Sequence, residues 1–325
     1  MLTRVVASID RWQRGHAVCG FPLAVLKKFG EDRASSLAAL IAYYAFLSLF
    51  PLLLAFVSIL GFVLDDNPTL RADVVDTALA RIPVLGAELS DDVQPLTGSG
   101  VALAVGLVGA LWAGLGVTVA LSRAFADVWD TPRVEQARGL KTRARGLLLL
   151  AILGATLVTS TAAAALAVGA RIGPAAERGA AVAGALGVNV VAFLTVFALL
   201  TPGPRRVRSL LPGVGLAAVG ALILQSLGGW YVDHAVADAS AIYGTFALVI
   251  GLLSWFWLSA HLLLIAAEVN AVLHWHLWPR SIAGELEPAD HLALQRYADA
   301  ARHDEREQIT VSFRERASSD AEADR

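Results

Sequence analysis

His261 and Glu268 lie in one apolar stretch near the C-terminus and are the ionisable residues best placed to act inside a membrane. They are seven residues apart, so a helix would carry them on nearly the same face, two turns from each other, together with Trp257. An ionisable group at membrane depth is costly and usually faces a partner or a water-filled cavity. For Glu268, a structural salt bridge and a role in a transport pathway are both open. For His261, a structural role is the favoured interpretation, and a place in a transport pathway is the alternative.

Other polar residues within apolar stretches extend this candidate set. Asn189 and Gln225 favour hydrogen bonds between helices, with contact to a ligand as the alternative. Arg123 and Asp127 are four residues apart at the end of an apolar stretch. They are expected to form an inner salt bridge with Glu268 from a neighbouring helix.

Residues 42–54, "AYYAFLSLFPLLL", are apolar enough for a bilayer but contain four residues that are unusual there. Pro51 removes the hydrogen bond to the carbonyl of Leu47 and is expected to kink the helix. Ser48 is placed to hydrogen-bond a backbone carbonyl near that break. Tyr43 and Tyr44 fit the inner membrane interface, and the alternative is that their hydroxyls line an inner vestibule.

Several kinds of chemistry find no support in the sequence. The single cysteine, Cys19, excludes an internal disulfide framework and a cysteine-based metal site. The seven histidines are dispersed, and His274 and His276 would point to opposite sides of a helix. Neither a cofactor nor a metal is expected. The basic loops lack the interleaved aromatic residues of a nucleic-acid groove, so no nucleic-acid partner is predicted.

The composition defines the elements that position these residues. Hydrophobic residues make up 56% of the 325 residues and charged residues 17%, too apolar a balance for a chain that is water-soluble throughout. Six runs reach the roughly 20 residues that a helix needs to cross a bilayer. They are Leu37–Leu64, Val101–Phe125, Gly146–Ala170, Ala180–Thr201, Leu211–Tyr231 and Ala241–Leu273. The sequence therefore predicts an all-α polytopic bundle of six transmembrane helices in residues 37–274.

The positive charges predict the orientation of this bundle. Of the 26 Lys and Arg residues, 22 lie in the N-terminal segment, the second and fourth connections and the C-terminal part, and 4 lie in the other connections. The positive-inside rule then places both termini in the cytoplasm. Residues 1–36 form a cytoplasmic segment with an interfacial helix at Phe21–Arg33, and residues 275–325 form a polar cytoplasmic tail. Residues 65–100 form an acidic external loop with an amphipathic helix.

Small residues recur at four-residue spacing in several spans and indicate close helix packing. In the fifth span they continue through a glutamine: Gly213, Ala217, Ala221, Gln225 and Gly229. Packing within one chain is the favoured interpretation, and a homo-oligomer interface is the alternative.

Three blocks of sequence resemble one bacterial family. They are "AYYAFLSLFPLLL" followed by "SILG", "ALWAGLGVTVALSRAFADVWD", and "IYGTFALVIGLLSWFWLSAHLLLIAAEVNA". Over about residues 20 to 280 the chain is similar to the BrkB/YihY-type family of six-span bacterial inner-membrane proteins, historically labelled "ribonuclease BN". The third block adds Tyr243 and Asn270 to the candidate residues.

The resemblance implies an inner-membrane protein for which transport, including that of lipids, has been suggested. We therefore expect a transporter or lipid translocator that has membrane lipids as partners and an unknown substrate. The alternative is a non-transporting scaffold or envelope-assembly partner. The residues argue against ribonuclease activity, because neither clustered metal ligands nor a paired acid and base beside a phosphate site is visible.

Overall fold

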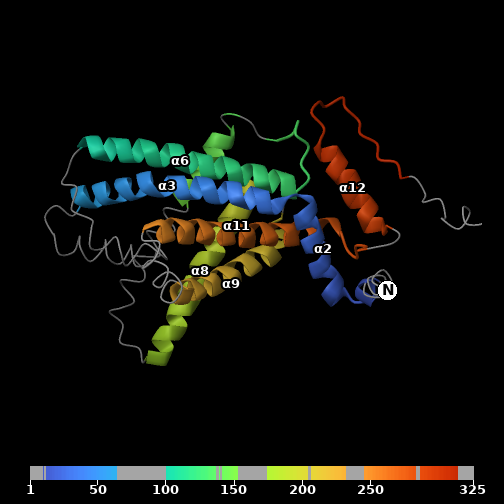
Figure 1. The fold of residues 1–325 in the computed structure, drawn as a ribbon, viewed down its shortest axis with the longest axis horizontal. Helices are drawn as coiled ribbons and strands as arrows, with labels where there is room; N and C mark the ends of the chain where they lie inside the picture. Colours follow the sequence, from blue (N-terminus) through green and yellow to red (C-terminus); the bar gives the residue numbers. More distant parts are fainter. Residues whose placement is uncertain are drawn as a thin grey trace, which may run out of the picture. The chain divides into compact units, whose positions relative to one another are not determined.

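The computed structural model describes residues 10, 12–63, 100–136, 139, 141–152, 174–203, 206–231, 245–282 and 286–313. These residues form helices and connecting turns, and no strand occurs among them. The helices are α2 (Ala17–Glu31), α3 (Ala34–Val63), α6 (Gly100–Val128), α8 (Pro174–Leu200), α9 (Val207–Tyr231), α11 (Thr245–Trp275) and α12 (Pro288–Ala300) (Figure 1). Residues 141–152 are helical as well.

Five of the described helices, α3, α6, α8, α9 and α11, are long and apolar enough to cross a membrane. They correspond to the first, second, fourth, fifth and sixth predicted spans and confirm an all-helical protein with several apolar helices. The third predicted span begins in the helical residues 141–152 and continues outside the described residues. The external loop at 65–100, apart from the helical residue 100, also lies outside them.

The chain divides into two compact units. Unit 1 consists of Met1–Ala24, Asp130–Gln136 and His276–Arg325, and unit 2 consists of Val25–Trp129 and Ala137–Trp275. The candidate membrane spans belong to unit 2. The predicted polar tail forms part of unit 1 and contains α12.

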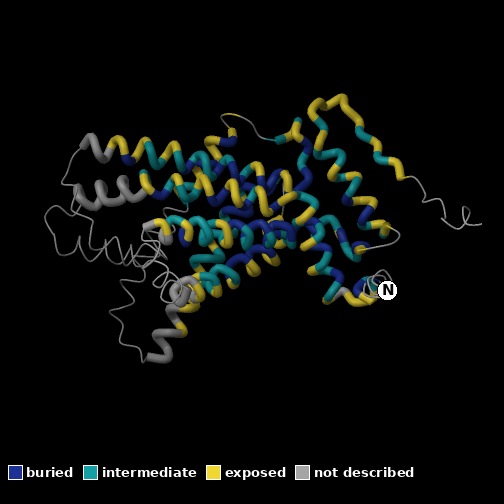
Figure 2. Tube along the Cα trace, in the orientation of Figure 1, coloured by how far each residue is buried: buried dark blue, intermediate teal, exposed yellow. Residues whose placement is uncertain are grey.

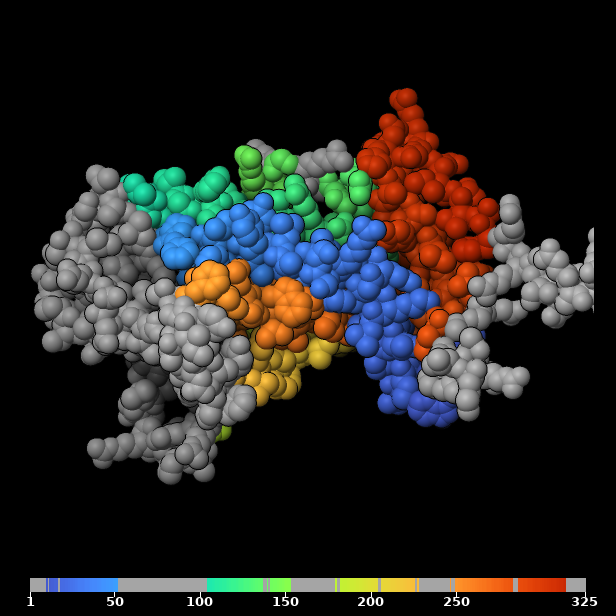
Figure 3. Space-filling model, in the orientation of Figure 1, coloured from blue at the N-terminus to red at the C-terminus, as the bar shows by residue number. Residues whose placement is uncertain are grey.

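In unit 2, α3 packs along α6, α11 packs against both α3 and α9, and α8 packs against α9. The surfaces of α3 and α11 lie side by side in Figure 3. The buried residues of α11 include four alanines that are at most 3% exposed: Ala260, Ala266, Ala267 and Ala271. Larger side chains fill the space between α6 and α8, where the rings of Phe125 and Phe197 meet edge to face, 5.2 Å apart. Buried residues gather where the helices face one another (Figure 2).

Glycines allow the helices of unit 2 to approach closely. A Cβ atom on Gly109 of α6 would lie 2.9 Å from the Cβ of Pro51, and one on Gly116 would lie 2.9 Å from the Tyr44 ring. On α9, a Cβ at Gly213 would collide with the backbone carbonyl of Ala266, and one at Gly220 would press on Leu262 of α11. The absence of a side chain at these positions brings the helix backbones together.

The predicted small-residue stripe of α9 begins in the contact with α11. Gly213 approaches α11 closely, and Ala217 is fully buried. Gly220, which is not part of the stripe, also approaches α11 closely, whereas Gln225, further along the stripe, is exposed. A helix repeats every 3.6 residues, so a strict four-residue spacing gradually moves around its surface.

Gly213 and Gly215 of α9 offer a matched pair for testing this packing. Gly213→Ala should destabilise the protein by about 1–3 kcal/mol or more, because its Cβ meets a backbone oxygen of α11 that cannot move aside. Gly215→Ala should leave stability unchanged or raise it by about 0.5–1 kcal/mol, since no atom lies within 4 Å of the new Cβ. Thermal unfolding of the detergent-solubilised protein measures both. Equal melting temperatures for the two variants would contradict the close approach of α9 to α11.

Candidate functional site

One face of α11 carries Trp257, His261 and Glu268, as predicted. Residues of α2 and of the beginning of α3 contact this face. The Nδ1 atom of His261 lies 2.9 Å from the carbonyl oxygen of Trp257, one turn earlier, and its Nε2 atom lies 3.2 Å from Oγ of Ser35. The rings of Trp257 and Phe29 flank the imidazole, with centroids 3.8 and 5.5 Å away. Both imidazole nitrogens therefore lie beside a polar atom, and the half-buried ring is held between α2 and α11.

Two turns further along α11, Glu268 belongs to a buried charge cluster with Lys28 and Asp32. The Nζ atom of Lys28 lies 2.6 Å from Oδ2 of Asp32 and 3.8 Å from Oε2 of Glu268. The three side chains are at most 3% exposed. Removing charges from water is expensive, and opposite charges at short distance offset much of that cost. We call Lys28, Asp32 and Glu268 the charge cluster.

The salt bridge that the sequence predicted for Glu268 differs from this arrangement. Arg123 and Asp127 are exposed at the end of α6, whereas Glu268 is fully buried beside Lys28. The sequence analysis did not predict Lys28 as a site residue, because the positive-inside rule already explained its charge. One signal could have indicated it: Lys28 and Asp32 are four residues apart, the spacing of a helical ion pair.

Asn270 is fully buried between α11 and α9. Its Oδ1 atom accepts a hydrogen bond of 2.8 Å from the backbone N–H of Gly213, and its Nδ2 atom donates one of 3.1 Å to the carbonyl of Leu210. These two residues flank Pro212, which has no N–H to contribute to the helix. Asn270 therefore joins α11 to the backbone of α9 where a proline interrupts the hydrogen bonding of that helix.

The residues of the "AYYAFLSLFPLLL" stretch lie along α3. Ser48 donates a hydrogen bond of 2.8 Å to the carbonyl of Ala45, one turn before Pro51. The helix is continuous through Pro51, which packs on Gly109, and the predicted kink remains a prediction. Tyr43 and Tyr44 are 53% and 36% exposed, and their rings meet edge to face.

The remaining candidates are not brought to the charge cluster by any contact of the described residues. Asn189 is half-buried on α8, and its amide nitrogen has no hydrogen-bond partner in the described part of the chain. Gln225 is exposed on α9. Tyr243 lies outside the described residues. The structure thus assembles one candidate site around His261 and Glu268, with α2 as a contributor that the sequence analysis had not included.

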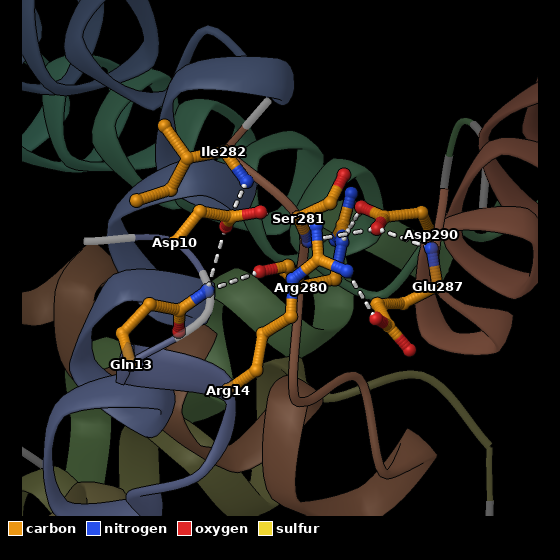
Figure 4. A network of polar contacts seen from close by, with 8 residues as sticks. All are labelled: Asp10, Gln13, Arg14, Arg280, Ser281, Ile282, Glu287 and Asp290. Atoms are coloured by element: carbon orange, nitrogen blue, oxygen red, sulfur yellow. Dashed lines mark hydrogen bonds and ion pairs between the residues drawn. The ribbon is translucent and has the colours of Figure 1, made fainter. Parts of the chain in front are cut away.

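Unit 1 contains a second polar network, which joins the N-terminal segment to the C-terminal part (Figure 4). Its members are Asp10, Gln13, Arg14, Arg280, Ser281, Ile282, Glu287 and Asp290. Asp290, at the start of α12, is 1% exposed and accepts hydrogen bonds from Nε of Arg280 and from the backbone N–H groups of Ser281 and Glu287. Arg280 is fully buried, so this ion pair forms the centre of the network.

Asp10 connects this centre to the N-terminal segment. Its carboxylate accepts hydrogen bonds from the Ile282 N–H, from Gln13 and from Arg14, which also pairs with Glu287. Burial by itself would raise the pKa of Asp10, but these hydrogen bonds outweigh it and hold the pKa below its usual value. Asp10 is therefore present as a carboxylate, and it ties residues near both ends of the chain together.

A third stretch of chain, residues 130–136, packs on the C-terminal part of unit 1. The backbone N–H groups of Arg133 and Val134 donate to the carbonyls of Ala300 and Arg302, each at 3.2 Å. Arg302 also pairs with Glu135 at 2.9 Å. Unit 1 is therefore held together by contacts among three stretches of chain that are distant in sequence.

The described residues contain no group of three or more His, Cys, Asp or Glu side chains placed to hold a metal ion. The fold and the charge cluster define a polytopic α-helical membrane protein with ionisable groups buried among its helices. The model of the family "Virulence factor BrkB" matches residues 25–287, and the chain belongs to this family.

Two curated proteins are similar to this chain along most of their own length. YfkH of Bacillus subtilis (strain 168), which its name describes as ribonuclease-like, is 29% identical over 77% of this chain and 94% of its own length. The inner membrane protein YhjD of Escherichia coli (strain K12) is 26% identical over 88% of this chain and 90% of its own length. No solved structure is significantly similar to this chain.

The two hydrogen bonds of Asn270 lead to a stability prediction. Asn270→Leu should leave the Gly213 N–H and the Leu210 carbonyl buried without this partner, at a cost of about 1–3 kcal/mol for each group. Gln225→Leu, an exposed amide on α9, serves as the control and should change stability little. Thermal unfolding in detergent compares the two variants. A melting temperature of Asn270→Leu as high as that of Gln225→Leu would show that Asn270 does not join the two helices.

Proposed function

We propose that the protein is a transporter or lipid translocator of the bacterial inner membrane and that the charge cluster lies on its pathway. The observation that carries this proposal is Glu268, a fully buried carboxylate on a helix long and apolar enough to span the membrane. Apolar residues could fill the same space without the cost of burying charge. Ionisable residues in such positions mark substrate or ion pathways as a rule.

The geometry of the charge cluster suits an exchange of partners. Lys28 lies close to Asp32, at 2.6 Å, and further from Glu268, at 3.8 Å. Lys28 belongs to α2 and Glu268 to α11, whereas Asp32 directly follows α2. A small displacement of α2 along α11 would therefore separate Lys28 from Glu268 while preserving its contact with Asp32. A cationic solute, a proton or a lipid amine could then take the place of the lysine at Glu268.

Unit 1 supports the six-span topology in which this pathway would operate. Its three stretches contact one another, so all lie on the same side of the membrane, and the chain crosses an even number of times between them. Between residues 136 and 276, α8, α9 and α11 supply three crossings. A fourth is needed, and the third predicted span, Gly146–Ala170, would supply it. Together with the positive-inside rule, this parity supports the proposal that both termini lie in the cytoplasm.

Transport is tested by reconstitution into liposomes with fluorescent phospholipids and with candidate solutes. Flux should exceed that of empty vesicles for at least one substrate and should fall by about tenfold or more in Glu268→Gln and in Lys28→Gln. The matched controls Glu305→Gln and Arg123→Gln remove exposed charges and should retain the flux. Size-exclusion profiles establish that each variant is folded. Flux equal to that of empty vesicles for every substrate, or full flux in folded Glu268→Gln, would refute the proposal and favour the scaffold alternative.

The topology is tested with single cysteines in a Cys19→Ser background. A membrane-impermeant maleimide applied to spheroplasts should label Ser90→Cys and Arg178→Cys, in the predicted external connections. Glu305→Cys and Gln136→Cys should be labelled only after permeabilisation, because both belong to unit 1. Protection of Arg178→Cys in intact spheroplasts would show that the third span does not cross the membrane.

A further inference from the structure

Helix α2 presents an apolar stripe to its surroundings. Val18 is 85% exposed and Leu26 is 60% exposed, and Pro22 between them is also exposed. These residues are four apart, so they follow one face of the helix. We call Val18, Pro22 and Leu26 the α2 stripe.

The opposite face of α2 is buried and contains the charged residue Lys28. Gly20, Ala24 and Lys28 follow each other at the same four-residue spacing, and all three are buried. A helix at the surface of a water-soluble protein shows the reverse pattern, with apolar residues inward and charges outward. The inverted polarity of α2 indicates that its outer surroundings are not water alone.

The covalent connection of α2 indicates what covers the α2 stripe. α2 ends at Glu31 and the candidate span α3 begins at Ala34, so the C-terminal end of α2 lies at the end of a membrane-spanning helix. Arg33 forms the tight turn between them with a φ of 52°. A helix of 15 residues is about 22 Å long, so the whole stripe stays near the membrane boundary if α2 lies along it.

The residues around the stripe fit a phospholipid surface. Lys27 is half-buried and Arg33 is exposed, so both cations are accessible beside the stripe, together with the half-buried Glu31. Lys28 and Asp32 pair with each other on the buried side. On α3, exposed apolar side chains continue with helical spacing at Leu40, Tyr43, Leu47 and Phe50, as expected for a side that faces lipid. Cations beside an apolar stripe are the pattern by which an in-plane helix binds acyl chains and anionic headgroups.

We propose that α2 lies in the cytoplasmic leaflet of the membrane, with the α2 stripe among the acyl chains and Arg33 at the phosphate groups. This interaction does not depend on the proposed transport. It has a structural consequence, because the same helix holds Lys28 against Asp32 and Glu268 on its other face. Lipid contact at the stripe therefore acts on the element that positions the lysine of the charge cluster.

The proposal is tested by fluorescence quenching in lipid. Val18→Cys and Leu26→Cys, each in a Cys19→Ser background, are labelled with an environment-sensitive fluorophore and reconstituted into vesicles of phosphatidylethanolamine and phosphatidylglycerol. Lipids with a nitroxide on the acyl chain should quench both labels at least about twofold more than a label at Gln295→Cys, which is exposed on α12. All three positions are exposed, so labelling should leave the fold intact.

Two outcomes would overturn the proposal. Quenching at positions 18 and 26 no stronger than at position 295 would show that α2 does not contact the acyl chains. Weak quenching combined with efficient disulfide cross-linking between two copies of the unlabelled Leu26→Cys variant would show that a second copy of the chain covers the stripe. Neither outcome depends on whether the reconstituted protein transports a substrate.

Discussion

The burial of Glu268 among membrane-spanning helices is the constraint on which much of unit 2 depends. A carboxylate without exposure to water requires a nearby positive charge, and Lys28 supplies one from α2. This requirement explains why α2 turns its charged face toward α11, and the turn at Arg33 allows α2 and α3 to approach α11 together. It also explains why His261, on the same face of α11, lies beside Phe29 and Ser35.

Around this cluster, the bundle achieves close packing by different means on different helices. α9 approaches α11 through Gly213, and the fully buried Asn270 binds the α9 backbone on both sides of Pro212. α6 approaches α3 through Gly109 and Gly116, which receive Pro51 and Tyr44. Lipid offers no hydrophobic driving force between helices, so close backbone contact and buried hydrogen bonds must stabilise the bundle. The proline and tyrosine of α3 therefore contribute to packing, whatever further role they have.

Unit 1 shows that the polar parts of the chain are organised as well. Asp290 and Arg280 form a buried ion pair, and Asp10 and Arg14 extend it to the N-terminal segment. Residues 130–136 join through backbone hydrogen bonds. Charged side chains with several hydrogen bonds each replace the apolar core that such short segments cannot form by themselves.

The sequence by itself determined the class of protein, five of the membrane-spanning helices, the family, and His261 and Glu268 as neighbours on one helix face. These properties follow from hydropathy and helical periodicity, which are local to each segment. Only the tertiary structure decided that Glu268 lies beside Lys28 of α2, that Asn270 joins α11 to α9, and that Gly213 and Gly220 of α9 closely approach α11. Each of these depends on which helices are neighbours and on how each helix is rotated about its axis. The residue pattern of a single helix encodes neither its neighbours nor its rotation.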